Sequence, residues 1–346
     1  MRCFHLFHGR WTRLSVLSVA AGALATVASM AAPSFGAVVS FGTGANTFTM
    51  DFVTIGNAGN TADTTGSPSS VGAVGYEYGI GKFEVSEDMI TKYNANFGTA
   101  NNLVITQDNR GSAKPATSVS WNEAARFVNW LNTSTNGFAA YKFTTGGVND
   151  HIALWTASDT LDYDASNPYR SKRATYVIPS YNEWYKAAYY NPNDSTYYDY
   201  ANGSNTRPTA VVGGTGSNTA VYWYTGEAEP EVPADVSQAG CLSPYGVMGL
   251  GGNVDEFDEV LYYGDSSNIA TTSRGVRGGR WHTVVASHLS SSSRNSIHPS
   301  YENGGVGFRV ASLSSSAPPA VPEPSMMVIG TLFGIGGLMA KRRMKK

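Results

Sequence analysis

Two histidines and a threonine gather in the stretch RGGRWHTVVASH, residues 277–288. His282 and His288 lie six positions apart, and Thr283 directly follows the first of them. Imidazole nitrogens bind copper, iron and zinc, and with His298 half of the chain's six histidines fall within 17 residues. On a regular strand His282 and His288 would stand about 20 Å apart, so they could share an ion only if the loop between them folds back. The alternative is a pair of exposed or hydrogen-bonded histidines on a polar stretch.

Three helices are expected to support such a site. Residues 120–132 begin with a Ser-x-x-Glu capping box, and their apolar residues recur at helical spacing, which predicts one buried face. Residues 180–191 begin with a second capping box, and Pro192 ends them. A third helix follows Ser86, which can act as its N-cap residue.

Composition indicates a chain of short elements joined by many turns. It has 38 glycines and 15 prolines in 346 residues, spread along its length. Residues 193–240 are expected to form one long loop, which in a compact domain needs something, such as an ion, to hold it.

Both ends of the chain are typical of targeting segments. Residues 1–36 combine three arginines, an apolar run and small residues, which predicts a signal peptide and therefore an exported protein. Residues 313–320 form a Ser/Pro/Ala linker. In residues 321–346 the sequence VPEPS, an apolar run and KRRMKK follow one another, and the run of 15 apolar residues would be about 22 Å long as a helix, shorter than the hydrocarbon core.

This C-terminal order resembles the PEP-CTERM sorting signal of exported bacterial proteins. The resemblance implies an exosortase-type sorting machinery as partner, contact with the membrane before processing, and a final location at the cell surface or in the extracellular matrix.

Charge and cysteine content exclude some functions. Residues 37–320 carry 16 basic and 25 acidic side chains, a net charge of −9 that argues against nucleic acid as a partner. Cys241 is the single cysteine outside the predicted signal peptide, so neither an internal disulfide nor a cysteine pair for a metal ion is expected.

Five motifs in order, spread over residues 76–311, resemble the formylglycine-generating enzyme or sulfatase-modifying factor family, and the resemblance extends over about residues 52–312. They are YEYGIGKFEVS, PATSVSWNEAARFVNWLN, VIPSYNEWYKAAYY, SPYGVMGLGGNVDEF, and RGVRGGRWHT followed by GVGFRVA. The resemblance assigns residues 37–312 to this domain. It implies a mixed α/β, C-type-lectin-like fold that is rich in loops.

The best-known members of this family oxidise a sulfatase cysteine to formylglycine with oxygen and a copper ion bound by two cysteines. The two cysteine positions match Thr283 and His288, and the family serine matches Arg280. Monovalent copper prefers thiolate ligands, so neither copper binding nor formylglycine formation is expected. We therefore expect a binding or structural module with an unknown surface ligand. The alternative is a divergent metal-dependent oxidase, with His282 as a further candidate catalytic residue.

A structural calcium ion is the one cofactor that the resemblance implies. Its ligands would come from Gly252, Asn253, Val254 and Glu256 in the motif GGNVDEF, a mixture of carbonyl and carboxylate oxygens that suits calcium. Arg277 and Arg309 match structural arginines of the family.

Overall fold

The computed structural model describes residues 36–67, 69–261 and 269–313. The predicted sorting segment, nearly all of the predicted linker and all but the last residue of the predicted signal peptide lie outside these residues. Across the described ranges, no helix combines the length and the apolar character needed to span a bilayer.

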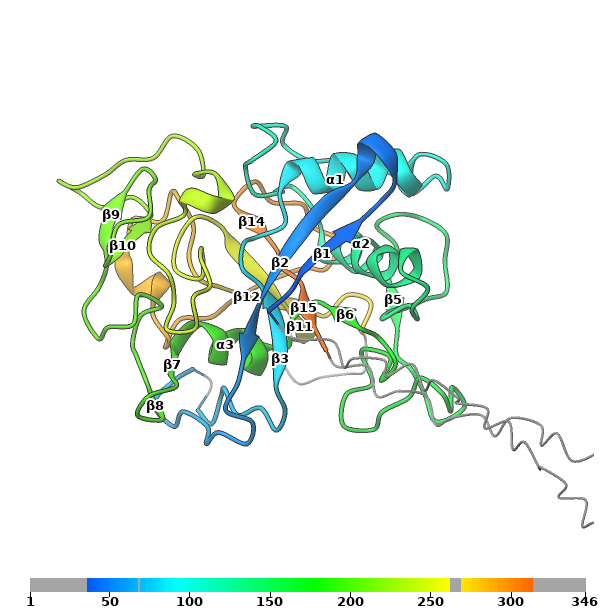
Figure 1. Ribbon diagram of the computed structural model, residues 1–346, viewed down its shortest axis with the longest axis horizontal. Coiled ribbons are helices and arrows are strands. Elements are labelled where there is room, and N and C mark those ends of the chain that lie inside the picture. The colour runs from blue at the N-terminus through cyan, green and yellow to red at the C-terminus, as the bar shows by residue number, and fades with distance from the viewer. Residues whose placement is uncertain (1–35, 68, 262–268, 314–346) are drawn as a thin grey trace, which may run out of the picture. The chain divides into compact units, whose positions relative to one another are not determined.

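The three predicted helices are confirmed (Figure 1): α1 (Glu87–Tyr93), α2 (Trp121–Ser134) and α3 (Tyr181–Tyr189). Both predicted capping boxes form. In the first, the Ser120 amide donates to the Glu123 carboxylate over 2.8 Å, while the Glu123 amide donates to the Ser120 hydroxyl over 3.2 Å. The prediction for Ser86 was only half right, because it precedes α1 but its side chain makes no capping hydrogen bond.

A five-stranded antiparallel sheet has the strand order β1-β2-β3-β15-β6. Its strands are β1 (Val38–Phe41), β2 (Phe48–Ile55), β3 (Tyr78–Gly81), β15 (Ala311–Ser312) and β6 (Tyr176–Val177). β15, the last described strand, therefore pairs with both β3 and β6, so the two ends of the domain meet in one sheet (Figure 1).

A second sheet, of four strands, carries the motifs of the candidate site. Its order is β13-β12-β11-β14, and its strands are β13 (Asn295–Ile297), β12 (Arg274–Arg277), β11 (Asp255–Leu261) and β14 (Val306–Gly307). The pair β11–β14 is parallel and the other two pairs are antiparallel. This sheet places the start of β11 beside the end of β12, so the motifs GGNVDEF and RGGRWHT meet.

The predicted long loop, residues 193–240, contains more structure than expected. It holds β8 (Thr196–Tyr197), which pairs with β7 (Tyr190–Asn191), the parallel pair β9 (Thr209–Val211) and β10 (Thr219–Val221), and the 3-10 helix η3 (Val236–Gln238). An ion pair of 2.6 Å between Arg207 and Glu227 ties it together, and the Arg207 guanidinium stacks on the Tyr224 ring. These side chains help to hold the segment 193–240 in place, a role for which an ion was one of the expected candidates.

The remaining described elements are short. They are η1 (Gly44–Asn46), a π-helical turn η2 (Asn94–Gly98) that extends α1, the hairpin of β4 (Lys142–Phe143) and β5 (Ile152–Ala153), and the 3-10 helix η5 (Ala286–Leu289). This content is a mixed α/β fold with few helices and much irregular chain, as predicted.

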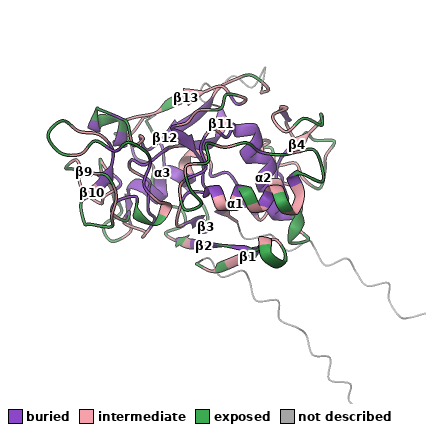
Figure 2. Cartoon of the chain, turned by 90° about the horizontal axis from the view of Figure 1, so that it is seen from above, coloured by how far each residue is buried: buried purple, intermediate pink, exposed green. Residues whose placement is uncertain are grey.

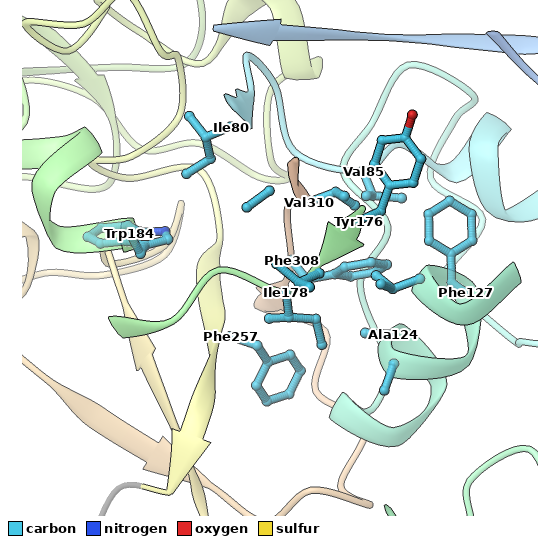
Figure 3. Close-up of a cluster of buried hydrophobic side chains, with 14 of the residues drawn as sticks. Ile80, Val85, Ala124, Phe127, Tyr176, Ile178, Trp184, Phe257, Phe308 and Val310 are labelled. Atoms are coloured by element: carbon cyan, nitrogen blue, oxygen red, sulfur yellow. The ribbon is translucent and has the colours of Figure 1, made fainter. Parts of the chain in front are cut away.

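The hydrophobic core lies between the two sheets and the helices α2 and α3 (Figure 2). Ala124 and Phe127 of α2 face Ile178 and Phe308, and the Phe127 and Phe308 rings meet edge to face at 5.8 Å (Figure 3). The predicted apolar stripe of α2 is buried, but the prediction of one buried face was too narrow, because every residue from Trp121 to Asn132 except Asn129 is buried. Edge-to-face contacts of this kind pack α2 against the segment that follows β14.

Replacing Asn132 with alanine should lower the free energy of unfolding by about 2–4 kcal/mol. The buried Asn132 amide joins α2 to β6, since its Nδ2 donates to the Tyr176 carbonyl and its Oδ1 accepts from the Thr175 and Tyr176 amides. Truncation leaves the buried carbonyl and amide of Tyr176 and the partly buried amide of Thr175 without these partners. Urea unfolding followed by circular dichroism measures the loss, and the exposed Thr133→Ala variant should change stability by less than about 0.5 kcal/mol.

Candidate functional site

The stretch 277–288 forms a tight turn after β12 rather than a continued strand. Gly278 and Gly279 have φ angles of 99° and 76°, which strain any residue with a Cβ atom. The turn Arg280–Thr283 then closes through a hydrogen bond of 2.9 Å from the Thr283 amide to the Arg280 carbonyl. The 20 Å separation of a regular strand therefore does not apply to His282 and His288.

Thr283, which the resemblance matches to the first family cysteine, is a buried part of this turn. Its hydroxyl accepts a hydrogen bond of 3.2 Å from the Arg280 amide, and its carbonyl accepts one of 3.1 Å from the Trp223 amide. The side chain is 6 % exposed. The hydrogen bonds of Thr283 therefore close the turn. A hydroxyl group at this position is a poor ligand for a soft metal ion, which prefers a thiolate.

The three clustered histidines do not converge in the structure. His282 is largely exposed, and its ring meets the Trp281 ring edge to face at 4.4 Å. The partial loss of solvent around the ring, and next the Arg280 charge, lower the pKa of His282. His288 is exposed on η5, and the His298 ring shares a hydrogen bond of 2.8 Å with the Ser300 hydroxyl. Within the described residues, no group of three or more histidine, cysteine, aspartate or glutamate side chains is placed to hold a metal ion.

His288 instead lines a small cavity with charged walls. The cavity has a volume of about 130 Å³, and its lining includes Arg277, Arg280, Arg294 and Asp255. Burial raises the pKa of Asp255 to about 6, although Arg280, whose Nε lies 3.6 Å from the carboxylate, opposes that shift. The wall of this cavity therefore contains three guanidinium groups and one imidazole.

The turn predicted to bind calcium is a buried junction between distant segments. Gly252 has a φ of 92°, and a Cβ atom there would lie 2.4 Å from the Val221 carbonyl oxygen. The Asn253 side chain accepts a hydrogen bond of 2.8 Å from the Ala234 amide and donates one of 2.9 Å to Glu84. The turn thus connects residues 221 and 234 of the long loop to the chain that follows β3.

Glu256, the carboxylate predicted to bind calcium, has protein partners for both of its oxygens. Arg309 donates to them from Nε over 2.6 Å and from Nη2 over 2.5 Å, and the Trp184 indole donates over 2.7 Å. Glu256 and Arg309 are both fully buried. Both oxygens of Glu256 thus already accept charged hydrogen bonds, so a calcium ion on this carboxylate would share it with Arg309. The role of Glu256 as a calcium ligand stays a prediction. The match of Arg309 to a structural arginine agrees with these contacts.

Glu84 is a second buried carboxylate beside this turn, and no motif in the sequence pointed to it. Its side chain is fully buried against the turn 249–253, and within the described residues its Oε2 has no hydrogen-bond partner. Burial, together with the nearby Glu256 charge, raises its pKa to about 8. A buried carboxylate with a free oxygen beside Asn253 suits a cation, because the cation would supply the missing charge and contact.

A mixed α/β core with short helices, much irregular chain and a sheet that carries the motifs GGNVDEF and RGGRWHT defines a C-type-lectin-like protein of the formylglycine-generating enzyme type. A profile of the sulfatase-modifying factor enzyme 1-like domain matches residues 40–313. The chain belongs to this family, which confirms the resemblance seen in the sequence.

Solved structures with this fold include CarF and variable protein 1 of Treponema denticola. CarF is 17% identical with a TM-score of 0.54, and the match covers 76% of this chain and 98% of CarF. The Treponema protein is 20% identical with a TM-score of 0.50, and the match covers 80% and 98% of the two chains. At these identities the likeness supports the fold alone. No curated protein matches the chain.

Proposed function

We propose that this protein is an exported binding module of the cell surface or matrix that retains the family scaffold without the copper chemistry. The observation that supports this most directly is the state of the two family cysteine positions. Thr283 is buried in a turn, and His288 is exposed on η5 beside arginines. A soft copper ion has no thiolate at either position, so oxidation of a substrate cysteine through such an ion has no basis here.

Cys241 does not replace the missing thiols. It is partly buried in a loop where its amide donates to the Thr219 carbonyl over 3.0 Å. Burial raises the pKa of its thiol, which disfavours the thiolate form that binds metals and attacks electrophiles. The thiol chemistry of the family therefore has no alternative donor among the described residues.

A structural calcium ion is the cofactor that we propose for the module. Glu84, the Asn253 region and the carbonyl groups of Gly252 and Val254 would hold it, and Glu256 would remain with Arg309. The ion would join the chain after β3 to the turn before β11, because these segments meet at Glu84 and Asn253. Its role would be to rigidify the base of the candidate site.

The proposed cellular location of the protein depends on its N-terminal and C-terminal segments. The predicted signal peptide and PEP-CTERM-like segment would bring it to exosortase-type sorting machinery, with membrane contact before processing. Expression in a host with and without an exosortase tests this, since the proposal expects a surface fraction only in the former.

Metal analysis and a peptide oxidation assay test the loss of copper chemistry. We expect less than about 0.1 equivalent of copper or iron in the purified chain after incubation with either metal, since imidazoles alone do not converge. We also expect no aldehyde from a cysteine-containing sulfatase peptide supplied with oxygen and copper. Stoichiometric copper or iron that disappears in His288→Ala, or any enzyme-dependent aldehyde, would instead favour a divergent oxidase that uses His282 and His288.

A further inference from the structure

The cavity beside His288, which we term the cationic cavity, carries more positive than negative charge. Its lining includes Arg277, Arg280 and Arg294 but one carboxylate, Asp255. We propose that the cationic cavity binds an oxyanion group, the carboxylate, sulfate or phosphate of a larger ligand. This inference rests on the proposed binding function and names the chemistry that the module recognises.

Arg277 provides the strongest argument, because it is a buried cation without a carboxylate partner among the described residues. It is 2 % exposed, and its guanidinium donates to the backbone carbonyls of Ser291, Ser293 and Ser67. Its Nε has no hydrogen-bond partner in the described part of the chain. Burying an unpaired charge destabilises a fold substantially, so an anion in the cavity would offset a real cost.

The neighbouring carboxylates form their ion pairs with other arginines, and Asp258 acts on Arg277 only as a nearby charge. Arg280 lies 3.6 Å from Asp255, and Arg294 lies 3.2 Å from Asp258, so each carboxylate already has one guanidinium. Arg277 is thus the arginine of the cavity that forms no ion pair within the described residues. The His288 imidazole adds a further hydrogen-bond donor to the cavity wall. This local excess of positive charge lies in a domain whose residues 37–320 carry a net charge of −9. An attraction for anions is therefore a property of the cavity and not of the domain.

The size of the cavity limits what it can take. A volume of about 130 Å³ corresponds to roughly four water molecules, which suits a carboxylate, sulfate or phosphate group. Guanidinium groups present paired N–H donors that match the oxygens of such groups. The cavity would thus recognise a charged group at the end or side of a surface ligand.

Anion titration of the full chain tests the proposal. Sulfate, phosphate and acetate are added at constant ionic strength, with chloride as the balancing salt, and binding is followed by calorimetry and by the thermal unfolding midpoint. We expect saturable binding of at least one oxyanion with a dissociation constant of roughly 1 mM or below. Arg280→Gln should weaken it about tenfold, since it removes a charged donor.

Control variants keep the test independent of folding. Arg173→Gln removes an arginine of similar exposure that pairs with Asp162 away from the cavity, so it should retain full affinity. Arg277→Gln should abolish binding, and if that variant fails to fold, the partly exposed Arg280 still decides the question.

Preference for sulfate or phosphate would identify a tetrahedral group, and preference for acetate a carboxylate; either supports the proposal. Binding that Arg280→Gln leaves unchanged, or that chloride reproduces, overturns it. Such a failure would leave the absence of copper and of peptide oxidation untouched, so it is distinguishable from failure of the proposed function.

Discussion

Replacing Arg309 with methionine should lower the free energy of unfolding by about 3–5 kcal/mol. This loss is a large part of the roughly 5–15 kcal/mol by which native domains are stable, so the unfolding midpoint of the variant should fall sharply. The reason is that the change removes the cation and leaves the Glu256 carboxylate in the core. Arg309 and Glu256 are both fully buried, and two charged hydrogen bonds, of 2.5 and 2.6 Å, join them.

The guanidinium of Arg309 also forms hydrogen bonds with backbone carbonyl groups of two other segments. Its Nη1 donates to the Gly81 carbonyl over 2.7 Å, and its Nη2 donates to the Met248 carbonyl over 2.8 Å. Gly81 ends β3, and Met248 lies in the segment that leads into the turn before β11. Arg309 therefore ties two segments, those of Gly81 and Met248, to β11, and methionine can replace its volume but none of these bonds.

A second change should recover part of the loss. In Arg309→Met combined with Glu256→Gln, the unpaired buried charge is gone, so we expect stability to return by about 1–3 kcal/mol relative to the single variant. Urea unfolding monitored by circular dichroism measures both. Arg173→Met, which breaks a partly exposed pair with Asp162, should cost less than about 1 kcal/mol. Equal losses in the single and double variants would show that the hydrogen bonds to the carbonyls, not the charge, dominate.

Local rules in the sequence predicted the helices well. The capping boxes at Ser120 and Ser180 depend on residues three positions apart, and both form as predicted. The order of strands depends on contacts between distant segments, such as the pairing of Ala311 with Ile80, and no spacing within one motif contains that information. The fold class came from the family motifs together.

The candidate site was predicted by residue type more than by geometry. The resemblance placed Thr283 and His288 at the former copper positions, but the glycine turn that separates their surroundings became visible only in three dimensions. Glu84 was missed because its partner Asn253 lies 169 residues away. Glu256 was assigned to calcium because its type and position matched, whereas its competing cation, Arg309, lies 53 residues further on. Competition between partners for one carboxylate cannot be deduced from either motif alone.

Without calcium, the chain should lose stability on the order of 4 kcal/mol at Glu84 as the pH rises from 4.5 to 8. The pKa of Glu84 is raised to about 8 from an ordinary value of 4.5, mainly because the carboxyl group is buried. For an acid with a raised folded-state pKa, the stabilising contribution is complete below pH 4.5 and is lost as the pH rises through 8. Thermal and urea unfolding at pH 5 and pH 8 in the presence of EGTA measure this loss.

Calcium should reverse this loss, because it binds the ionised form of Glu84. At a hundredfold excess over its dissociation constant, the ion should add about 2.7 kcal/mol at pH 8. The gain should be smaller at pH 5, where protons compete for the carboxylate. The unfolding midpoint should therefore respond to calcium more strongly at the higher pH.

Glu84→Gln should remove both effects while keeping an oxygen that accepts from Asn253. In this variant the loss of stability between pH 5 and pH 8 should shrink by most of the 4 kcal/mol, and calcium should no longer shift the midpoint. The exposed Glu229→Gln variant should behave as the wild type in both respects, because it removes a carboxylate that is not buried. A full calcium response in Glu84→Gln would place the ion on other ligands. A wild type that ignores calcium at pH 8 would exclude the ion, and the pH dependence would then still decide whether Glu84 is a buried, uncompensated acid.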